Sequence, residues 1–442
     1  MKVQTTLPPT AAPIPAAALA AGLRGLLGAS GDAATIRREL QTWLQADYVD
    51  LVSSGKAALA IILGALASAA PKRRRVIIPA YTCYSVPSAV VKAGLDVVPC
   101  DVDPLTLDFR PDVLERLVDQ QTLAVLATHL FGNPSAIDRA VTVAHARGAL
   151  VIEDAAQAMG AESNGRVIGT IGDVGFFSLG RGKNLSCGGG GVIVSRQPKV
   201  SELLGRFAAS LETESWTTAA QVWAESFVTS VLIHPGVYWL PAGLPFLGLG
   251  ETKFYTDFPV TRMADARVSL LAGWRSRLEE DNRIRRGHAA ELIQLLRQHA
   301  PESQVVMGAN SIGLRLPVLL KDRAMKQALL RIGSERGLGI SQAYPGTIPD
   351  VKELQGRVSG VADAGARAVV ERMVTLPTHR YVTRAQRLAI AESIGQLYAE
   401  GRRQGVANDV GGLGTTRTVG KASGAASSKP GDGVAKVGAL HG

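Results

Sequence analysis

The sequence predicts an α/β fold in which helices cover both faces of a largely parallel sheet. Between residues 48 and 196, short β-branched runs alternate with alanine-rich helical stretches. Several of these runs are continuously apolar, as is typical of strands that are buried on both faces. At 442 residues and 46% hydrophobic content, the chain is long enough to form two or three structural units.

The strands expected in this α/β unit are rich in β-branched and apolar residues. In chain order they read YVDLVSS, RVIIPAY, LDVVPCDV, LAVLATHLF, ALVIEDAA and GVIVS. Parallel neighbours need a long crossover connection, which is usually a helix. The segments long enough to supply one are Lys56–Ala70, Ser85–Ala93, Pro111–Gln120 and Ser135–Arg147. The alternation therefore indicates an α/β domain.

Residues 200–260 break this pattern. They contain Trp216, Trp223 and Trp239, together with the turn-rich segment HPGVYWLPAGLPFLGLGETKFYTDFP. Such an excursion packs its aromatic side chains on the body of the protein or at a subunit contact, or it forms a patch that lies on a membrane surface. We favour packing on the body or at a subunit contact.

The C-terminal part predicts a smaller α/β domain. From Ala264 to about Arg297 the sequence is typical of one long helix, and SIGLRLPVLL, LGIS and MVTLP are expected strands. The segments RAMKQALLRIGSERG and RAQRLAIAESIGQLYAEGRR are expected helices. The last residues are rich in Gly, Ser, Thr and Ala and are expected to be disordered. The predicted parts are an N-terminal segment 1–47, a large domain 48–263, a linking helix with the small domain 264–404, and a tail 405–442.

Composition and patterning exclude several classes of protein. The formal net charge is +10, but Lys and Arg are scattered and aromatic residues do not interleave with them, so we expect no nucleic-acid binding. Cys83, Cys100 and Cys187 have no paired spacing, which indicates free thiols, a reducing compartment and no metal site. Proline interrupts the apolar N-terminus, and runs such as Ala57–Ala70 are shorter than the ~20 residues of a membrane span. We expect a cytoplasmic protein.

One lysine stands among glycines in SLGRGKNLSCGGGG, at Lys183. A Walker phosphate loop needs glycine five positions before the Gly-Lys pair and Ser or Thr after it, but Phe177 and Asn184 occupy these places. A dinucleotide fingerprint would need a third glycine where Leu185 stands. The spacing excludes both nucleotide loops.

Lys183 fits a nucleophile better, because an acid and an anion cradle stand upstream of it. The run ALVIEDAAQAMGA carries Asp154 and Gln157 at the end of an expected strand, where open α/β sheets place ligands. The run LVSSGKAALAIILGAL passes from a strand through Ser54 and Gly55 into a helix, whose free N–H groups and nearby Lys56 suit an anion. Pyridoxal phosphate requires such a lysine, such an acid and a phosphate cradle.

Several motifs in one order carry a resemblance to a known family. They are SSGKAAL, PAYTCYSVPSAVVKAGLDVVPCDVDPLTL, THLFGNPSAIDR, VIEDAAQAMGA, GDVGFFSLGRGKNLSCGGGG and VTRMADARVSLLAGWRSRLEEDNRIRR. From about Tyr48 to Arg402 the chain resembles the DegT/DnrJ/EryC1/StrS family of sugar aminotransferases. The resemblance implies pyridoxal-phosphate-dependent transferase fold type I, with a mostly parallel seven-stranded sheet in the large domain and a smaller α/β C-terminal domain.

The resemblance also implies a role for each matching residue. Lys183 would bond covalently to the cofactor and shuttle a proton, Asp154 would pair with the ring nitrogen, and Gln157 would lie beside the ring. The phosphate would be held by Ser178, Ser54, Gly55 and Lys56. The implied partners are an amino acid donor, either glutamate or glutamine, a nucleotide-linked keto sugar, and a second copy of the chain in a homodimer.

The chain departs from the family pattern at a few positions. Lys56 stands where Thr is usual, and Cys83 stands where an aromatic residue usually stacks on the cofactor. Tyr81 or Tyr84 could substitute for that aromatic residue. Arg262 lies in a segment that often reaches the partner subunit's site in this family, which makes it a candidate phosphate contact.

The sequence thus predicts an aminotransferase of polysaccharide or secondary-metabolite biosynthesis. A family dehydratase acting on 4-keto-6-deoxy sugars is an alternative, but that branch replaces the lysine with histidine, so Lys183 counts against it. A regulator that binds pyridoxal phosphate without turnover is the other alternative. Arg181 contacts either substrate phosphates or solvent. We assign no catalytic role to His129 or His379, and we interpret Cys187 as a small packed residue.

Overall fold

The computed structural model divides the chain into two compact units by its backbone contacts, Met1–Tyr398 and Ala399–Gly442. The sheets and the candidate site lie in the first unit. The residues that the structure describes are 5–29, 31–244, 252–356, 358 and 362–412.

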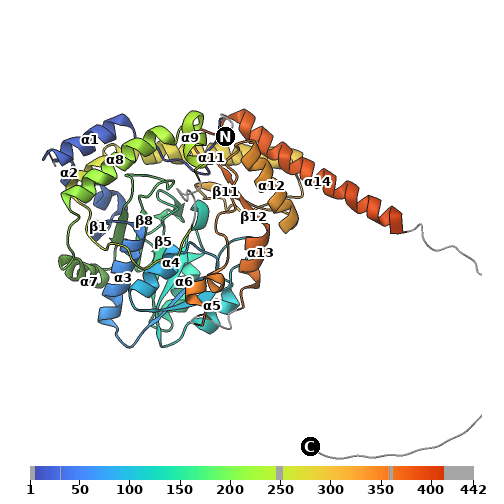
Figure 1. The fold of residues 1–442 in the computed structure, drawn as a ribbon. Coiled ribbons are helices and arrows are strands. Elements are labelled where there is room, and N and C mark those ends of the chain that lie inside the picture. Colours follow the sequence, from blue (N-terminus) through green and yellow to red (C-terminus); the bar gives the residue numbers. More distant parts are fainter. Residues whose placement is uncertain (1–4, 30, 245–251, 357, 359–361, 413–442) are drawn as a thin grey trace, which may run out of the picture. The chain divides into compact units, whose positions relative to one another are not determined.

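Seven strands form the central sheet, and Figure 1 shows the helices arranged around it. Their order across the sheet is β1-β9-β8-β5-β4-β2-β3. Neighbours run parallel except where β9 pairs with β1 and with β8. The predicted α/β class with a largely parallel sheet is confirmed. The bounds are β1 Tyr48–Val52, β2 Arg75–Pro79, β3 Asp96–Cys100, β4 Thr122–Thr128, β5 Leu150–Asp154, β8 Val174–Ser178 and β9 Gly191–Ser195.

The strand β8 is not among the strands that the sequence predicts, although it lies in the middle of the sheet. Its sequence, VGFFS, lacks a run of β-branched residues. Two aromatic rings supply the burial instead. Because successive side chains point to opposite faces of a strand, Phe176 packs in the cluster on one face and Phe177 in the cluster on the other.

Helices cover both faces of the sheet, as alternate residues of β2 show. Val76 and Ile78 pack in the cluster that holds α3 and α4, whereas Ile77 packs in the cluster that holds α5 and α6. These four helices begin and end close to the predicted crossover segments. Their bounds are α3 Gly55–Ala69, α4 Ser85–Lys92, α5 Pro111–Leu117 and α6 Ile137–His145.

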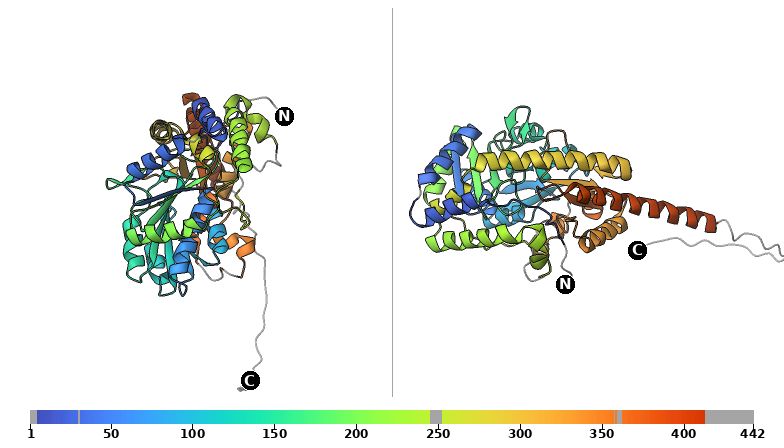
Figure 2. Two further views of the ribbon diagram at one scale, coloured as in Figure 1. Left: turned by 90° about the vertical axis from the view of Figure 1, so that its left-hand side faces the viewer. Right: turned by 90° about the horizontal axis from the view of Figure 1, so that it is seen from above.

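The excursion after β9 is helical, and it packs partly on the N-terminal segment. The indole nitrogen of Trp223 donates to the carbonyl of Leu19 at 2.8 Å, and that of Trp216 to the carbonyl of Leu26 at 3.0 Å. In Figures 1 and 2 the helix α8 lies beside α1. The excursion therefore packs on the body at these two tryptophans. The helices are α1 Ala16–Leu26, α2 Gly31–Leu44, α7 Pro198–Ala209, α8 Trp216–Leu232 and α9 Pro235–Ala242.

The predicted single helix from Ala264 to Arg297 is broken near its start. Gly273 adopts the left-handed conformation, with φ of 66°, and it separates two short helical turns from the long helix α11. Glycine reaches this conformation without a steric penalty, so the chain turns there before α11 begins. The three elements are α10 Asp265–Val268, a 3₁₀ turn Ser269–Leu271, and α11 Trp274–His299.

The segment predicted to form a small C-terminal domain contains a three-stranded antiparallel sheet in the order β10-β11-β12. Two of the three expected strands are present, but LGIS forms only an isolated bridge between Ser341 and Thr375. The elements are β10 Gln304–Val305, β11 Arg315–Leu319, α12 Arg323–Glu335, α13 Ala364–Arg372, β12 Met373–Pro377 and α14 Arg384–Gly412. Shorter elements are β6 Glu162–Ser163, β7 Arg166–Val167, and 3₁₀ turns at Leu130–Gly132, Ile348–Asp350 and Lys352–Leu354.

The predicted tail begins inside a helix, since α14 continues to Gly412. Residues 413–442 of that tail lie outside the described residues. Within the described ranges, none of the helices is both long and apolar enough to cross a membrane.

Candidate active site

The sequence-predicted residues gather at one edge of the central sheet. Asp154 is the last residue of β5 and Ser178 is the last residue of β8, and these two strands are parallel neighbours. Lys183 follows Ser178 in the loop that leads to β9. Parallel strands bring their carboxyl ends to the same edge, where open α/β sheets bind ligands.

The N-terminus of α3 lies directly against Ser178. Ser54 caps this helix, and its hydroxyl accepts a hydrogen bond from the Ala57 N–H at 3.0 Å. A Cβ atom on Gly55 would lie 3.0 Å from the Ser178 Cβ and 3.2 Å from the Ser178 Oγ. Only glycine permits this approach without displacing Ser178. The structure therefore brings Ser54, Gly55 and Ser178 together, as the predicted cradle requires.

Lys56 has an aromatic environment that sequence reasoning missed. Its Nζ lies 3.2 Å from the centroid of the Tyr255 ring and 4.9 Å from that of the Phe258 ring. Such cation–π contacts are worth roughly 0.5–2 kcal/mol. The Lys56 ammonium is thus held by aromatic residues near the end of the 200–260 excursion. Its contact with the cofactor phosphate stays a prediction.

Asp154 is a buried carboxyl group, only 6% exposed. Burial raises its pKa, while a hydrogen bond from the Ala156 N–H and the nearby side chains of Lys183 and His129 lower it. Within the described residues, no side-chain nitrogen forms an ion pair with it. A carboxyl group in this position is prepared to bind a cation or a protonated nitrogen.

His129 and Glu153 form a buried network beneath Asp154. The Nδ1 atom of His129 accepts a hydrogen bond from the Ser135 N–H at 3.0 Å, so its proton lies on Nε2, 3.0 Å from a Glu153 oxygen. Glu153 also accepts the backbone N–H groups of Gly169, Ile171 and Gly172. The backbone N–H of His129 donates a hydrogen bond to the backbone carbonyl of Asp154 at 3.0 Å. His129 therefore positions the end of β5.

Gln157 is held by two residues from distant parts of the chain. Its Oε1 accepts the Phe131 N–H at 3.1 Å, and its Nε2 donates to the Tyr344 hydroxyl at 2.7 Å. The Tyr344 ring lies 5.4 Å from the ring of Tyr81, centroid to centroid. Tyr84, the other residue considered as a substitute for the aromatic residue missing at Cys83, packs in the hydrophobic cluster that contains α3. Sequence reasoning missed Tyr344, because nothing local to it marks a site.

Lys183 lies among Cys83, Asp154 and Arg315. Burial lowers the pKa of its ammonium, the positive charge of Arg315 lowers it further, and the charges of Cys83 and Asp154 oppose this change. The loop around it is anchored, since the Thr10 hydroxyl donates to the Gly182 carbonyl at 2.8 Å. A lysine with a lowered pKa is available as the neutral amine, which is the nucleophilic form.

Two arginines left open by the sequence have partners in the structure. Arg181 is exposed and forms an ion pair of 2.6 Å with Glu225. Arg262 lies beside the end of β1, where its backbone forms an isolated antiparallel bridge with Val52. Its predicted contact with a partner subunit stays a prediction.

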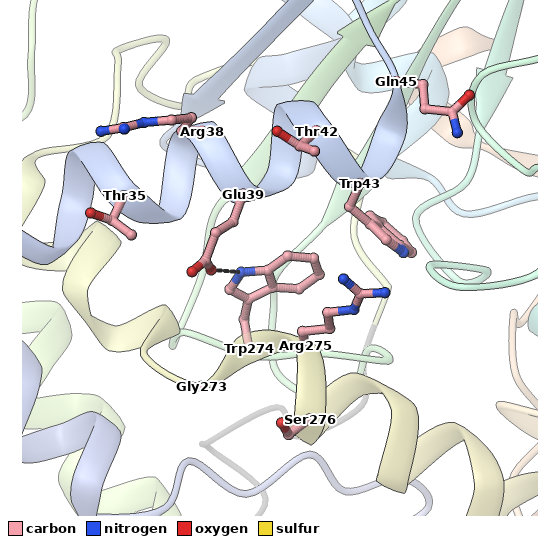
Figure 3. Close-up of a pocket in the computed structure, with 10 residues that line it drawn as sticks. All are labelled: Thr35, Arg38, Glu39, Thr42, Trp43, Gln45, Gly273, Trp274, Arg275 and Ser276. Atoms are coloured by element: carbon pink, nitrogen blue, oxygen red, sulfur yellow. Dashed lines mark hydrogen bonds between the residues drawn. The ribbon is translucent and has the colours of Figure 1, made fainter.

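A separate hollow of about 730 Å³ lies between α2 and α11, and Figure 3 shows the residues that line it. None of the predicted site residues lines it. Its Glu39 carboxylate already accepts a hydrogen bond from the Trp274 indole at 2.9 Å. We therefore assign the chemistry to the sheet edge that carries Lys183. The lining residues are Thr35, Arg38, Glu39, Thr42, Trp43, Gln45, Gly273, Trp274, Arg275 and Ser276.

The fold and the lysine site define a class of α/β proteins in which a half-buried lysine and a buried acid stand at the same edge of the sheet. The family model described as the DegT/DnrJ/EryC1/StrS aminotransferase family matches residues 28–395, and the chain belongs to this family.

Several of the curated relatives are sugar or cyclitol aminotransferases by name. The dTDP-3-amino-3,4,6-trideoxy-alpha-D-glucose transaminase of Streptomyces venezuelae is 36% identical over 263 residues, which cover 54% of this chain and 68% of the relative. The L-glutamine:2-deoxy-scyllo-inosose aminotransferase of Streptomyces kanamyceticus is 36% identical over 159 residues, 36% of each chain. The chain spans about a third of the length of several other relatives, such as protein MosB of Rhizobium meliloti, at 32%.

Solved structures share the fold. The Helicobacter pylori PseC aminotransferase has a TM-score of 0.72 at 13% identity, covering 89% of this chain and 100% of its own. An E. coli GDP-4-keto-6-deoxy-D-mannose-3-dehydratase with bound hydrated PLP has a TM-score of 0.70 at 16% identity, with coverage of 88% and 100%. At these identities the likeness establishes the fold alone.

Proposed function

We propose that the chain is a pyridoxal-phosphate-dependent aminotransferase that moves an amino group from glutamate or glutamine to a nucleotide-linked keto sugar, in polysaccharide or secondary-metabolite biosynthesis. The observation that carries this proposal is the convergence of Lys183, Asp154 and the cradle of Ser54, Gly55 and Ser178 at one sheet edge. Family membership supports the transaminase activity.

Family membership and a neighbour with bound PLP both indicate pyridoxal phosphate as the cofactor. The residues present fit this group. Any larger side chain at Gly55 would fill the cradle formed by Ser54, Gly55 and Ser178. The buried hydroxyl of Thr82, next to Cys83 in the chain, has no hydrogen-bond partner among the described residues. When bound, pyridoxal phosphate acts as an electron sink for the carbon that carries the amine.

The chain's own residues would divide the remaining work. The Asp154 carboxylate would hold a proton on the ring nitrogen, because a buried anion binds that proton strongly. The N–H groups at the start of α3 and the Ser178 hydroxyl would bind the phosphate. The Nζ of Lys183, as a neutral amine, would bond to the cofactor. After the donor amine displaces it, the freed Nζ would accept and return the proton at the reacting carbon.

The names of the relatives support the substrates. L-glutamine is named as the donor of one set of relatives, and dTDP- and GDP-linked sugars are named for others. We propose the same chemical classes for this chain, and we propose a cytoplasmic homodimer as its working form.

A non-catalytic regulator is the second candidate. A Geobacillus stearothermophilus relative named pleiotropic regulatory protein is 34% identical over 128 residues, which cover 29% of this chain and 34% of the relative. The absence of an aromatic residue at Cys83 also favours it. The dehydratase alternative is disfavoured, because Lys183 stands where that branch carries histidine.

The visible absorption of the reconstituted protein tests the proposal. Wild type mixed with pyridoxal phosphate should show the band of cofactor bonded to a lysine, and Lys183→Ala should abolish that band. Addition of L-glutamate or L-glutamine should then convert the wild-type band to that of the aminated cofactor. A band that survives in Lys183→Ala contradicts the assignment of the lysine, and a wild type inert to every common donor favours the regulator.

A further inference from the structure

A cavity of about 720 Å³ opens beside the loop that carries Lys183. Its walls come from the N-terminal strap Pro8–Thr10, from α8 and α9, and from the first residue of β11, Arg315. The face of α8 that lines it is apolar at Ala224, Val228 and Leu232. A charge at an apolar wall is poorly solvated, so any electrostatic contact made there is strengthened.

Arg315 borders the cavity and acts electrostatically on the lysine. It lines the cavity wall, and its positive charge lowers the pKa of Lys183. Burial lowers the pKa of the Arg315 guanidinium itself, and the nearby hydroxyls of Tyr344, Tyr81 and Tyr238 oppose this change. Tyr344 is the residue that holds Gln157.

The guanidinium of Arg315 has no carboxylate partner within the described part of the chain. Other buried arginines do have partners there. Arg267 pairs with Glu214, Arg387 pairs with Glu291 at 2.6 Å, and Arg285 donates to the carbonyls of Ala11 and Asn184, among others. A partly buried cation is stabilised by a nearby anion, and the half-buried Arg315 borders a cavity.

We propose that Arg315 binds an anionic oxygen group of a substrate inside this cavity. The planar guanidinium can grip a carboxylate or a phosphate through two parallel hydrogen bonds. Two sources are available, namely the carboxylate of the amino donor and the phosphate of the acceptor. The proposal rests on the proposed function, because it assigns the site to that function's substrates, and it adds a residue that no family motif identified.

Two non-reacting probes distinguish the sources. Glutarate carries the carboxylates of glutamate without its amine, and uridine diphosphate carries a diphosphate without a sugar. Calorimetric titration of the holoenzyme should give a dissociation constant that is roughly tenfold or more weaker in Arg315→Gln for at least one probe, since hydrogen bonds to charged groups are the stronger ones. Arg315→Lys, which keeps the charge but loses the fork, should fall in between.

Arg181→Gln is the matched control. Arg181 lines the same cavity, but Glu225 already occupies its guanidinium. This variant should bind both probes within about twofold of wild type, because exposed ion pairs contribute little. Weakening in glutarate binding alone identifies the donor carboxylate, and weakening in uridine diphosphate binding alone identifies the acceptor phosphate.

Folding is checked independently by thermal denaturation. Because Arg315 lacks a carboxylate partner among the described residues, Arg315→Gln should keep or raise the midpoint of the protein without probes, and it should lose the rise in midpoint that a bound probe produces in wild type. Unchanged affinity of Arg315→Gln for both probes overturns the inference, as does equal weakening in Arg181→Gln or a wild type that binds neither probe.

Failure of this inference differs from failure of the proposed function. Suppose that the wild type shows the lysine-dependent band and reacts with the donor amine, but Arg315→Gln binds the probes as wild type does. This result contradicts the Arg315 assignment alone. A wild type without the lysine-dependent band sinks the aminotransferase proposal.

Discussion

Gly55→Ala tests the cradle at its tightest contact. The added Cβ would lie 3.0 Å from the Ser178 Cβ and 3.2 Å from its Oγ. Non-bonded carbon atoms prefer separations of about 3.5–4.0 Å, so α3 and the end of β8 must move apart by roughly half an ångström. Overpacking of this kind costs about 1–3 kcal/mol. Both elements bear residues proposed to bind the cofactor phosphate, so the movement should weaken that binding.

The favourable effect of alanine must be subtracted. Replacing glycine in a helix interior gains up to about 1 kcal/mol, and the gain is smaller at the first position, where Gly55 stands. The net loss in the free energy of unfolding should therefore be about 1–2 kcal/mol. If a similar loss falls on the phosphate site, the dissociation constant for pyridoxal phosphate rises roughly tenfold.

Two measurements check this prediction, urea denaturation of the apoprotein and its titration with pyridoxal phosphate. Gly287→Ala is the matched control. Gly287 lies in the interior of α11, and beyond the backbone of that helix no described atom lies within 4 Å of the position that an alanine methyl would take. That variant should be stabilised by about 0.5–1 kcal/mol and should bind the cofactor as wild type does. Gly55→Ala with wild-type stability and wild-type cofactor affinity would refute the reasoning.

Two further predictions concern the end of β5. Asp154→Asn should bind pyridoxal phosphate but lose most transaminase activity, and its apoprotein should be more stable than wild type at neutral pH. Burial raises the pKa of Asp154, so the carboxyl group contributes fully to stability below its unfolded pKa of 3.8, and this contribution is lost as the pH rises through its folded pKa. The denaturation midpoints of wild type and Asp154→Asn should therefore diverge between about pH 4 and pH 8. Parallel curves would contradict this. Glu153→Gln should lose roughly 2–4 kcal/mol in urea denaturation, because an amide N–H would face backbone donors and His129. The exposed Glu115→Gln should change stability by less than about 0.5 kcal/mol, and an equal loss in both variants would show that the network is not responsible.

Much of the large domain could be predicted because its strands are marked locally. The runs that form β2, β4 and β5 are predominantly apolar, and burial on both faces demands that composition in any parallel sheet. The strand β8 was not predicted, because the side chains of Phe176 and Phe177 supply its buried surface and it has no run of β-branched residues. The predicted long helix failed at Gly273, where one backbone conformation outweighs the helical pattern around it.

The candidate site divides in the same way. Asp154 could be proposed from sequence as the acid that acts with Lys183, because it stands at the end of an expected strand. Only the structure shows that the strand before Lys183 ends at the same edge, since β8 was not predicted. Tyr344 could not be found, since it reaches Gln157 across 187 positions of the chain. The aromatic environment of Lys56 was missed for the same reason, because Tyr255 and Phe258 come from the far end of the excursion.

The sequence by itself determined the α/β class, the order of the strands along the chain, and the lysine, acid and cradle on which the proposed chemistry depends. These features follow from local composition and from short spacings between residues, which do not depend on how distant segments pack. Only the tertiary structure decided that Arg315 of β11 acts electrostatically on Lys183 without a carboxylate partner among the described residues, at a cavity lined in part by α8. Contacts between distant segments depend on how whole elements pack, and no local pattern records that packing.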